Sequence, residues 1–115
     1  MISADYIVGL TDGEGCFYVN VRDRDSRWNP KVETYFYIKL REDNKDLLDE
    51  VKEYFGCGAV YFQKENRPNH SNCYRFEINS HKDIFSVLVP FFTEHPLHGT
   101  KQKDFEIFKE IALAV

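Results

Sequence analysis

Two carboxylates, Asp12 and Glu14, flank Gly13 at the end of an apolar run near the N-terminus. Carboxylate oxygens bind cations, so an acidic pair at this position is compatible with a bound metal ion. Acidic side chains at the C-terminal end of a helix oppose the helix dipole, and a bound cation would offset that cost. The alternative is a polar turn in which water solvates both acids.

A short helix is expected to carry this acidic pair. Ser3 can cap a helix over residues 4–11, and Gly13 and Gly15 are expected to end it. Gly9 and Gly13 are four residues apart, so they share one helix face.

Four segments alternate between apolar and polar side chains, the pattern of strands with one buried face. The predicted strands are residues 16–24, 32–41, 58–64 and 74–79. The polar residues 25–30 form a predicted turn or loop. The side chains expected to face outward are those of Tyr18, Asn20, Arg22, Arg24, Tyr35, Tyr37, Lys39, Arg41, Tyr61, Gln63, Arg75 and Glu77.

Three further helices are predicted. Asp43 or Asn44 is expected to cap the first, and Gly56 to end it. Ser80 and Asp83 resemble a capping box that opens the second. The buried stripe of this second helix is expected to be Ile84, Phe85, Leu88 and Val89.

Two prolines and a threonine set the remaining boundaries. Pro90 and Pro96 are expected to close the second helix, and Thr100 to cap the last one. The last helix has a face made of Phe105, Phe108, Ala112 and Val115. It reaches the final residue without a stop signal, which leaves open whether the chain is truncated there.

The order αββαββα with a tail helix predicts an α+β fold in a single domain, residues 1–115. Helices on one face of a four-stranded antiparallel sheet leave the other face open. The net charge of −4 counts against nucleic acid, but the strand regions are basic. Residues 16–41 carry six basic and three acidic side chains, and residues 56–82 carry four and two.

The open face combines tyrosines with amide and basic side chains. Arginine and amides contact base edges, and lysine and arginine neutralise phosphates, so this face is predicted to bind the major groove of double-stranded DNA. The alternative is a solvated sheet face.

Composition excludes several classes of protein. Apolar residues make up 43% of the chain and aromatic residues 16%, which argues against disorder. No run approaches the ~20 apolar residues of a membrane span, and no secretory signal is recognisable, so an intracellular protein is expected. Three cysteines without a CxxC pattern indicate reduced thiols. His95 and His98 lack a second ligand pair, so zinc is not expected.

Residues 7–15, IVGLTDGEG, resemble the LAGLIDADG motif of homing endonucleases. The segment LLDEVKEYFGCGAVY resembles the helix, glycine turn and third strand of that family, whose fold is αββαββα. The resemblance implies a homodimer in which the motif helices pack together through Gly9 and Gly13. It further implies that Glu14 ligates Mg²⁺, assisted by the backbone carbonyl of Gly13, and that Asp12 places the turn.

The implied activity is metal-dependent cleavage of both strands of a long, nearly palindromic DNA site, leaving short 3′ overhangs. The host gene would be an intron or intein. Lys101 best matches the basic active-site residue of the family, and Lys103 is the second choice. The alternative for Lys101 is an exposed residue in the first turn of a helix.

The chain departs from the family pattern in three ways. It has Glu14 where Asp is commoner, Leu40 where many relatives have a polar residue near the metals, and an acidic total. Leu40 and the charge favour a second hypothesis, a non-cleaving nucleic-acid binder such as an intron maturase or a domesticated DNA-binding protein. A glycosidase using Asp12 and Glu14 is disfavoured, because no sugar-binding pattern accompanies them.

Overall fold

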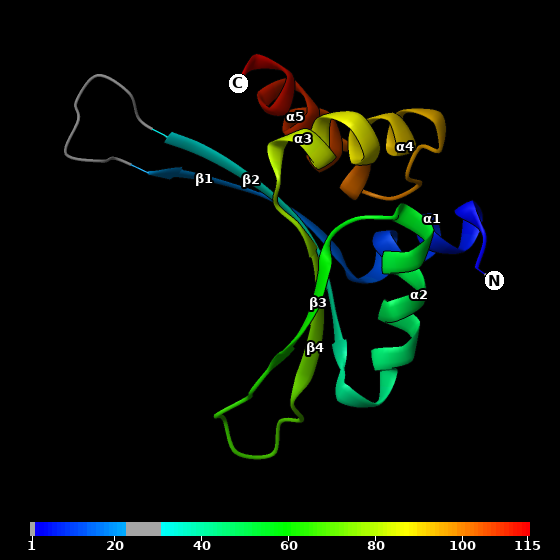
Figure 1. Ribbon diagram of the computed structural model, residues 1–115, viewed down its shortest axis with the longest axis vertical. Helices are drawn as coiled ribbons and strands as arrows, with labels where there is room; N and C mark the ends of the chain where they lie inside the picture. Colours follow the sequence, from blue (N-terminus) through cyan, green and yellow to red (C-terminus); the bar gives the residue numbers. More distant parts are fainter. Residues whose placement is uncertain (1, 23–30) are drawn as a thin grey trace.

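The computed structural model describes residues 2–22 and 31–115, and its elements follow the predicted order (Figure 1). The helical elements are α1 (Ala4–Glu14), η1 (Glu42–Asn44), α2 (Lys45–Phe55), α3 (His81–Asp83), η2 (Ile84–Leu88), α4 (Val89–Glu94) and α5 (Lys101–Ala114). The strands are β1 (Gly15–Arg22), β2 (Lys31–Arg41), β3 (Ala59–Gln63) and β4 (Cys73–Ile78). Arg24 and the predicted loop over residues 25–30 lie outside the described residues. Within the described part, no helix is long and apolar enough to cross a membrane.

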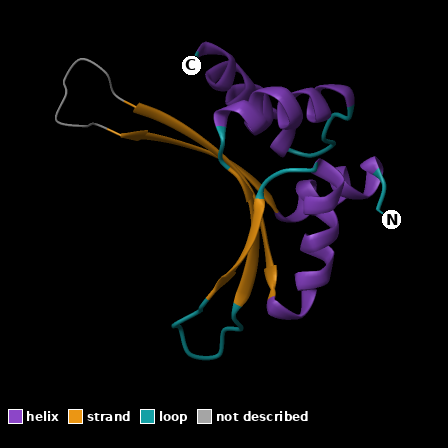
Figure 2. Ribbon diagram, viewed as in Figure 1, coloured by secondary structure: helices purple, strands orange, loops and turns teal. Residues whose placement is uncertain are grey.

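The strands form one antiparallel sheet in the order β1-β2-β4-β3. Phe36 lies opposite Phe17, and Ile38 lies opposite Phe76. Because successive side chains point to opposite faces of a strand, this register gathers the apolar residues on one face. The helices cover that face and leave the other uncovered (Figure 2). The predicted α+β fold is confirmed.

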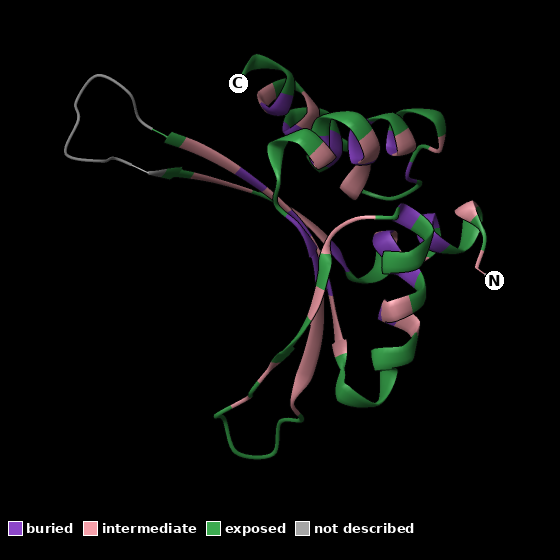
Figure 3. Ribbon diagram, viewed as in Figure 1, coloured by how far each residue is buried: buried purple, intermediate pink, exposed green. Residues whose placement is uncertain are grey.

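Aromatic rings fill the space between the sheet and the helices. The ring of Phe17 has its centroid within 5.5 Å of four other rings. Those rings belong to Phe36, Phe92, Phe105 and Phe108, and each of these side chains is at most 2% exposed. Burial of one such side chain contributes about 1.5–3 kcal/mol. This packing fixes α4 and α5 against the sheet, and Figure 3 shows buried residues along the elements that meet there.

Helix α1 is longer than expected, because it continues through Gly13 to Glu14. The buried residues Ile7, Val8 and Thr11 hold it against the core, and this packing outweighs the weak helix propensity of glycine. The helix ends at Gly15, whose backbone N–H donates to the Thr11 carbonyl.

Helix α2 ends as predicted. Gly56 has a left-handed backbone, φ 72°, and its N–H donates to the Lys52 carbonyl. The predicted side-chain cap at the other end is wrong. Asn44 occupies the cap position but makes no capping hydrogen bond, and Asp43 lies in the preceding 3-10 turn η1.

The predicted stop at Pro90 is also wrong, because the helical segment α3–η2–α4 runs through Pro90 to Glu94, although it does end before Pro96 as predicted. The intervening η2 is a π-helix, in which the Val89 N–H donates to the Ile84 carbonyl, one residue further back than in an α-helix. The wider turn alters the angular spacing of the side chains, and Phe85, expected in the buried stripe, is 51% exposed. Ser80 caps the segment by position, without the predicted side-chain hydrogen bond.

Helix α5 has the predicted buried face as far as Ala112. Val115 lies beyond the helix and is 60% exposed, so its assignment to that face is wrong. Thr100 occupies the N-cap position without a side-chain cap, since its backbone is already helical.

We predict that two glycines of the α2–β3 turn tolerate alanine differently. Gly56→Ala should lower the free energy of unfolding by about 1–2 kcal/mol, because its cost is the left-handed backbone alone and the new Cβ meets nothing within 4 Å. At Gly58 a Cβ would also lie 2.8 Å from the Glu77 carbonyl oxygen, so Gly58→Ala should cost at least about 1 kcal/mol more. Urea-induced unfolding measures the free energy of unfolding of both variants, and an equal decrease in the two would contradict this account.

Candidate active site and nucleic-acid interface

The acidic end of α1, residues 12–14, lies where the helix passes into the edge strand β1. Gly15 begins that strand and pairs with Ile38. Glu14 is exposed at this junction. The last carbonyl groups of a helix lack a partner within it, so the backbone oxygen of Gly13 is a second oxygen donor next to the Glu14 carboxylate.

Asp12 connects this end of α1 to the segment before α5. Its two carboxylate oxygens accept hydrogen bonds from the backbone N–H groups of His98 and Gly99, each 3.0 Å long. These contacts agree with the structural role that the family resemblance implies for Asp12. No sequence signal indicated the two partners, which lie more than 80 positions further along the chain.

Lys101 reaches the same end of α1. It is the first residue of α5, and its Nζ donates to the Asp12 carbonyl oxygen at 3.2 Å. The side chain is therefore partly buried and anchored, in contrast to a fully solvated lysine in a first helical turn. Lys103 is exposed two residues later on α5. The structure thus brings Lys101 beside the acidic end of α1, although 89 residues separate it from Asp12.

Gly9 and Gly13 lie on the exposed face of α1 together with Tyr6, which is 48% exposed. A Cβ added at either glycine would meet nothing within 4 Å. Packing inside this chain therefore does not account for the two small residues, and the face that they form remains available to a second molecule.

The uncovered face of the sheet carries, in register, the predicted outward residues whose side chains the structure describes. Tyr18 lies opposite Tyr35, and Arg75 lies between Lys39 and Tyr61 on the neighbouring strands. Asn20 donates a hydrogen bond to Glu33 at 3.4 Å. Two basic residues lie at strand ends, Arg22 on β1 and Arg41 on β2, and Gln63 ends β3.

Arg75 and Glu77 form an ion pair near the middle of this face. The Arg75 Nη2 lies 2.7 Å from a Glu77 oxygen, and Asn79 donates to the other oxygen at 2.8 Å. The Arg75 guanidinium stacks on Tyr37, with its Cζ 3.6 Å from the ring centroid. Burial, and then a hydrogen bond with Glu77, raise the pKa of Tyr61 to about 12. The alternation of the predicted strand 74–79 places Asn79 in the same outward row as Glu77, but Asn79 was not among the residues expected to contact DNA.

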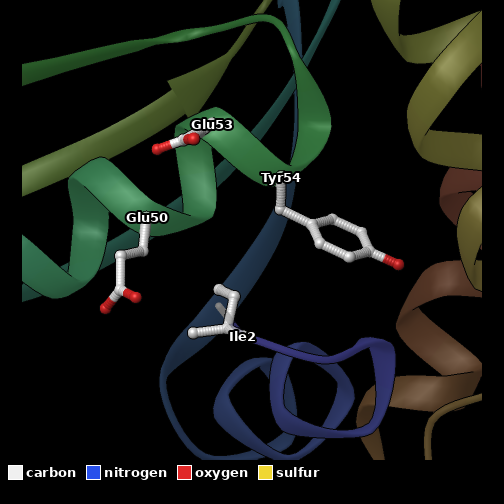
Figure 4. A pocket seen from close by; sticks show the side chains of 4 residues that line it. All are labelled: Ile2, Glu50, Glu53 and Tyr54. Carbon is white, nitrogen blue, oxygen red and sulfur yellow. The ribbon is translucent and has the colours of Figure 1, made fainter.

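One open cavity in the described part of the chain lies at the opposite end of α1 from Glu14. It has a volume of about 510 Å³ and is lined by Ile2, before the start of α1, and by Glu50, Glu53 and Tyr54 of α2 (Figure 4). Eleven residues of helix separate this cavity from Glu14, roughly 16 Å at 1.5 Å per residue. Across residues 2–22 and 31–115, no three His, Cys, Asp or Glu side chains gather as a metal site. A metal ion at Glu14 would therefore need ligands other than a cluster of acidic side chains within one copy of the chain.

Comparison with known proteins identifies relatives of the whole chain. A LAGLIDADG endonuclease family model matches residues 7–112. The homing endonuclease I-ApeII of Aeropyrum pernix is 30% identical over 111 residues, which cover 96% of this chain and 62% of I-ApeII. The chain spans smaller shares, 18% to 37%, of the other curated relatives.

Solved structures have the same fold. The homing endonuclease I-TnaI is 34% identical, with a TM-score of 0.81 over 97% of this chain and 72% of I-TnaI. The meganuclease I-SmaMI, solved bound to uncleaveable DNA, is 25% identical, with a TM-score of 0.84 over 96% of this chain and 37% of its own. Together with the motif at the end of α1, these matches show that the chain belongs to the LAGLIDADG family of homing endonucleases.

Proposed function

We propose that this chain is a site-specific DNA endonuclease that makes a metal-dependent double-strand break as a homodimer. The observation that carries the proposal is that Lys101 donates to the Asp12 carbonyl, two residues before Glu14, at the end of α1 that passes into the sheet. Membership of an endonuclease family and the DNA-bound state of I-SmaMI support it. A DNA substrate in the host genome implies an intracellular site of action.

The uncovered sheet face suits the DNA duplex. It presents amide, tyrosine and basic side chains in adjacent rows, and such groups contact base edges and phosphates. The strand regions are basic while the helices carry the acidic excess, so the net charge of −4 is concentrated on the elements behind the sheet. The face predicted to meet DNA is therefore the one on which phosphate attraction is strongest.

The exposed face of α1 supports a homodimer. Two copies related by a twofold axis can bring Gly9 and Gly13 of each helix together, because small residues permit close approach of two backbones. The same arrangement would bring two Glu14 carboxylates close to each other. One copy has one motif, so the dimer would supply two halves of an active site and bind two half-sites of a nearly palindromic target.

The donors at the acidic end of α1 fit Mg²⁺. The Glu14 carboxylate and the Gly13 carbonyl are hard oxygen ligands, which this ion prefers, and two copies would double their number. A bound Mg²⁺ would act as a Lewis acid on the phosphoryl oxygens and acidify a bound water.

Lys101 contributes a fixed positive charge to the same end of α1. Its Nζ donates to the Asp12 carbonyl, while the Asp12 carboxylate holds the preceding loop, so the ammonium group is positioned before substrate binds. A preorganised cation stabilises the negative charge that develops on phosphate oxygens during hydrolysis.

A second function, a non-cleaving nucleic-acid binder, is favoured by Leu40. Its side chain packs against the core and offers no hydrogen-bonding group. Leucine at position 40 is compatible with cleavage if another group orients the water near the metal ions. Incubation of the protein with Mg²⁺ and a duplex that it binds separates the two functions, since only the endonuclease yields shortened products.

We predict that Glu14→Gln abolishes cleavage and spares binding. Loss of a group that merely supports a metal ligand costs 10- to 100-fold, so loss of the ligand itself should lower the cleavage rate by at least about 100-fold. The assay is cleavage of a duplex selected from a randomised library, with binding measured in parallel by fluorescence anisotropy. Asp5→Asn, at the other end of α1, is the control and should cut normally. Wild-type cleavage by Glu14→Gln would refute the assignment of Glu14.

We also predict that the two lysines of α5 differ. Lys101→Met should lower the cleavage rate by about 10²–10³-fold, because it removes one preorganised donor to the developing oxyanion. Lys103→Met removes the same charge from an exposed position and should lower the rate less than about 3-fold. Single-turnover cleavage at saturating enzyme compares the two, and the reverse ranking would transfer the role to Lys103.

Gly9→Leu should disrupt the dimer without unfolding the chain. A Cβ at this position is unobstructed within one copy, and leucine has a higher helix propensity than glycine. Sedimentation velocity should therefore find a dimer for the wild type and a monomer for Gly9→Leu, with circular dichroism showing a folded chain in both. A wild type that stays monomeric on its DNA would overturn the homodimer.

A further inference from the structure

The ion pair on β4 differs from the other described arginine pairs of the molecule. The Arg41–Asp43 pair is 3.9 Å long between side chains that are 71% and 67% exposed. Arg67 is 68% exposed in its pair with Glu65. The Arg75 side chain is 21% exposed and that of Glu77 is 8% exposed, at a separation of 2.7 Å. Arg75 is therefore held within a largely buried site. In contrast, Arg41 is mostly exposed, and Arg67 is mostly exposed although its guanidinium donates two hydrogen bonds to Glu65.

Contacts with Glu77, Tyr37 and Tyr61 hold the Arg75 guanidinium. Glu77 accepts from Nη2 at one edge, and the Tyr37 ring supports the flat face with Cζ 3.6 Å from its centroid. Nε is buried without a partner. Because Nε is covered, the guanidinium can approach a base only through its Nη end. A long side chain that is already ordered loses less conformational entropy on binding than a free one.

The contacts of Glu77 are those of a residue that positions Arg75. Arg75 and Asn79 donate to its two oxygens at 2.7 and 2.8 Å, and Tyr61 interacts with it from β3. A carboxylate has about four lone-pair positions, and at 8% exposure little of this side chain is left to contact a base. Its placement differs from the direct DNA contact expected from the sequence.

We propose that Arg75 is the residue that determines specificity for one guanine in each half-site, and that Glu77 and Tyr37 position it. The planar fork of a guanidinium matches the two acceptors of guanine in the major groove, O6 and N7. Lys39, the neighbour of Arg75 on β2, carries a point charge on a flexible chain and suits phosphates instead. This inference rests on the proposed DNA-binding function, because the sheet must lie in the major groove.

The experiment selects bound duplexes from a randomised 24-base-pair library in Ca²⁺ and sequences them. The wild type should enrich a site with guanine at one position of each half-site. Arg75→Lys keeps the charge but loses the fork, and should reduce the preference for guanine about 5- to 150-fold at that position alone. Lys39→Gln is the matched control on the adjacent strand. It should weaken binding to all sequences alike and lower the salt dependence.

Substitutions of Tyr37 separate positioning from charge. Tyr37→Leu leaves the guanidinium intact but removes the ring on which it stacks, and should reduce the preference for guanine at the same position. Tyr37→Phe retains the ring and should therefore retain the preference for guanine. These two variants also give a result if Arg75→Lys does not fold, as judged by its thermal melt.

The outcomes distinguish this inference from the proposed function. If the wild type enriches a site and neither Arg75→Lys nor Tyr37→Leu alters the preference at any single position, Arg75 is not the reader, although DNA binding stands. If the folded wild type enriches no sequence, both proposals fail. Loss confined to one guanine in both variants supports the assignment.

Discussion

The attachment of the segment before α5 to the end of α1 is the constraint on which the candidate active site depends. The carboxylate of Asp12 accepts hydrogen bonds from two backbone N–H groups. The backbone carbonyl of Asp12 accepts a hydrogen bond from the Lys101 ammonium group. Each of these bonds involves a charged group, and such bonds are about twice as strong as neutral ones. These bonds hold the acidic end of α1 against the first turn of α5, in addition to the packing of the core.

The aromatic core and the uncovered sheet face are two consequences of one register. Pairing of Phe36 with Phe17 and of Ile38 with Phe76 turns the apolar rows toward the helices. The same pairing necessarily turns the tyrosine, amide and basic rows the other way. A one-residue slip would exchange the two faces, so the stability of the core and the recognition surface are selected together.

The uncovered face also shows how an acidic protein can be suited to a polyanion. Glu77 adds negative charge to the middle of this face, but its charge is matched by Arg75 and its oxygens are occupied. In the proposed complex with DNA, the pair would lose some attraction for phosphate and would gain an arginine of fixed geometry. That arrangement would favour discrimination among sequences over affinity for any duplex.

Alternation along the strands, the glycine at the end of α2 and the acids at the end of α1 were readable from the sequence, because each is a property of neighbouring residues. The continuation of helices through Gly13 and Pro90 was not, since burial and a π turn outweighed the local propensities there. The resemblance favoured Lys101 over Lys103, but the contact of Lys101 with the Asp12 carbonyl, 89 residues away in the chain, was not readable from the sequence. The local sequence determines which apolar and polar faces, and which charges, each helix or strand carries. Only the tertiary structure decides which of them meet, because contacts between distant segments are set by packing of the whole core.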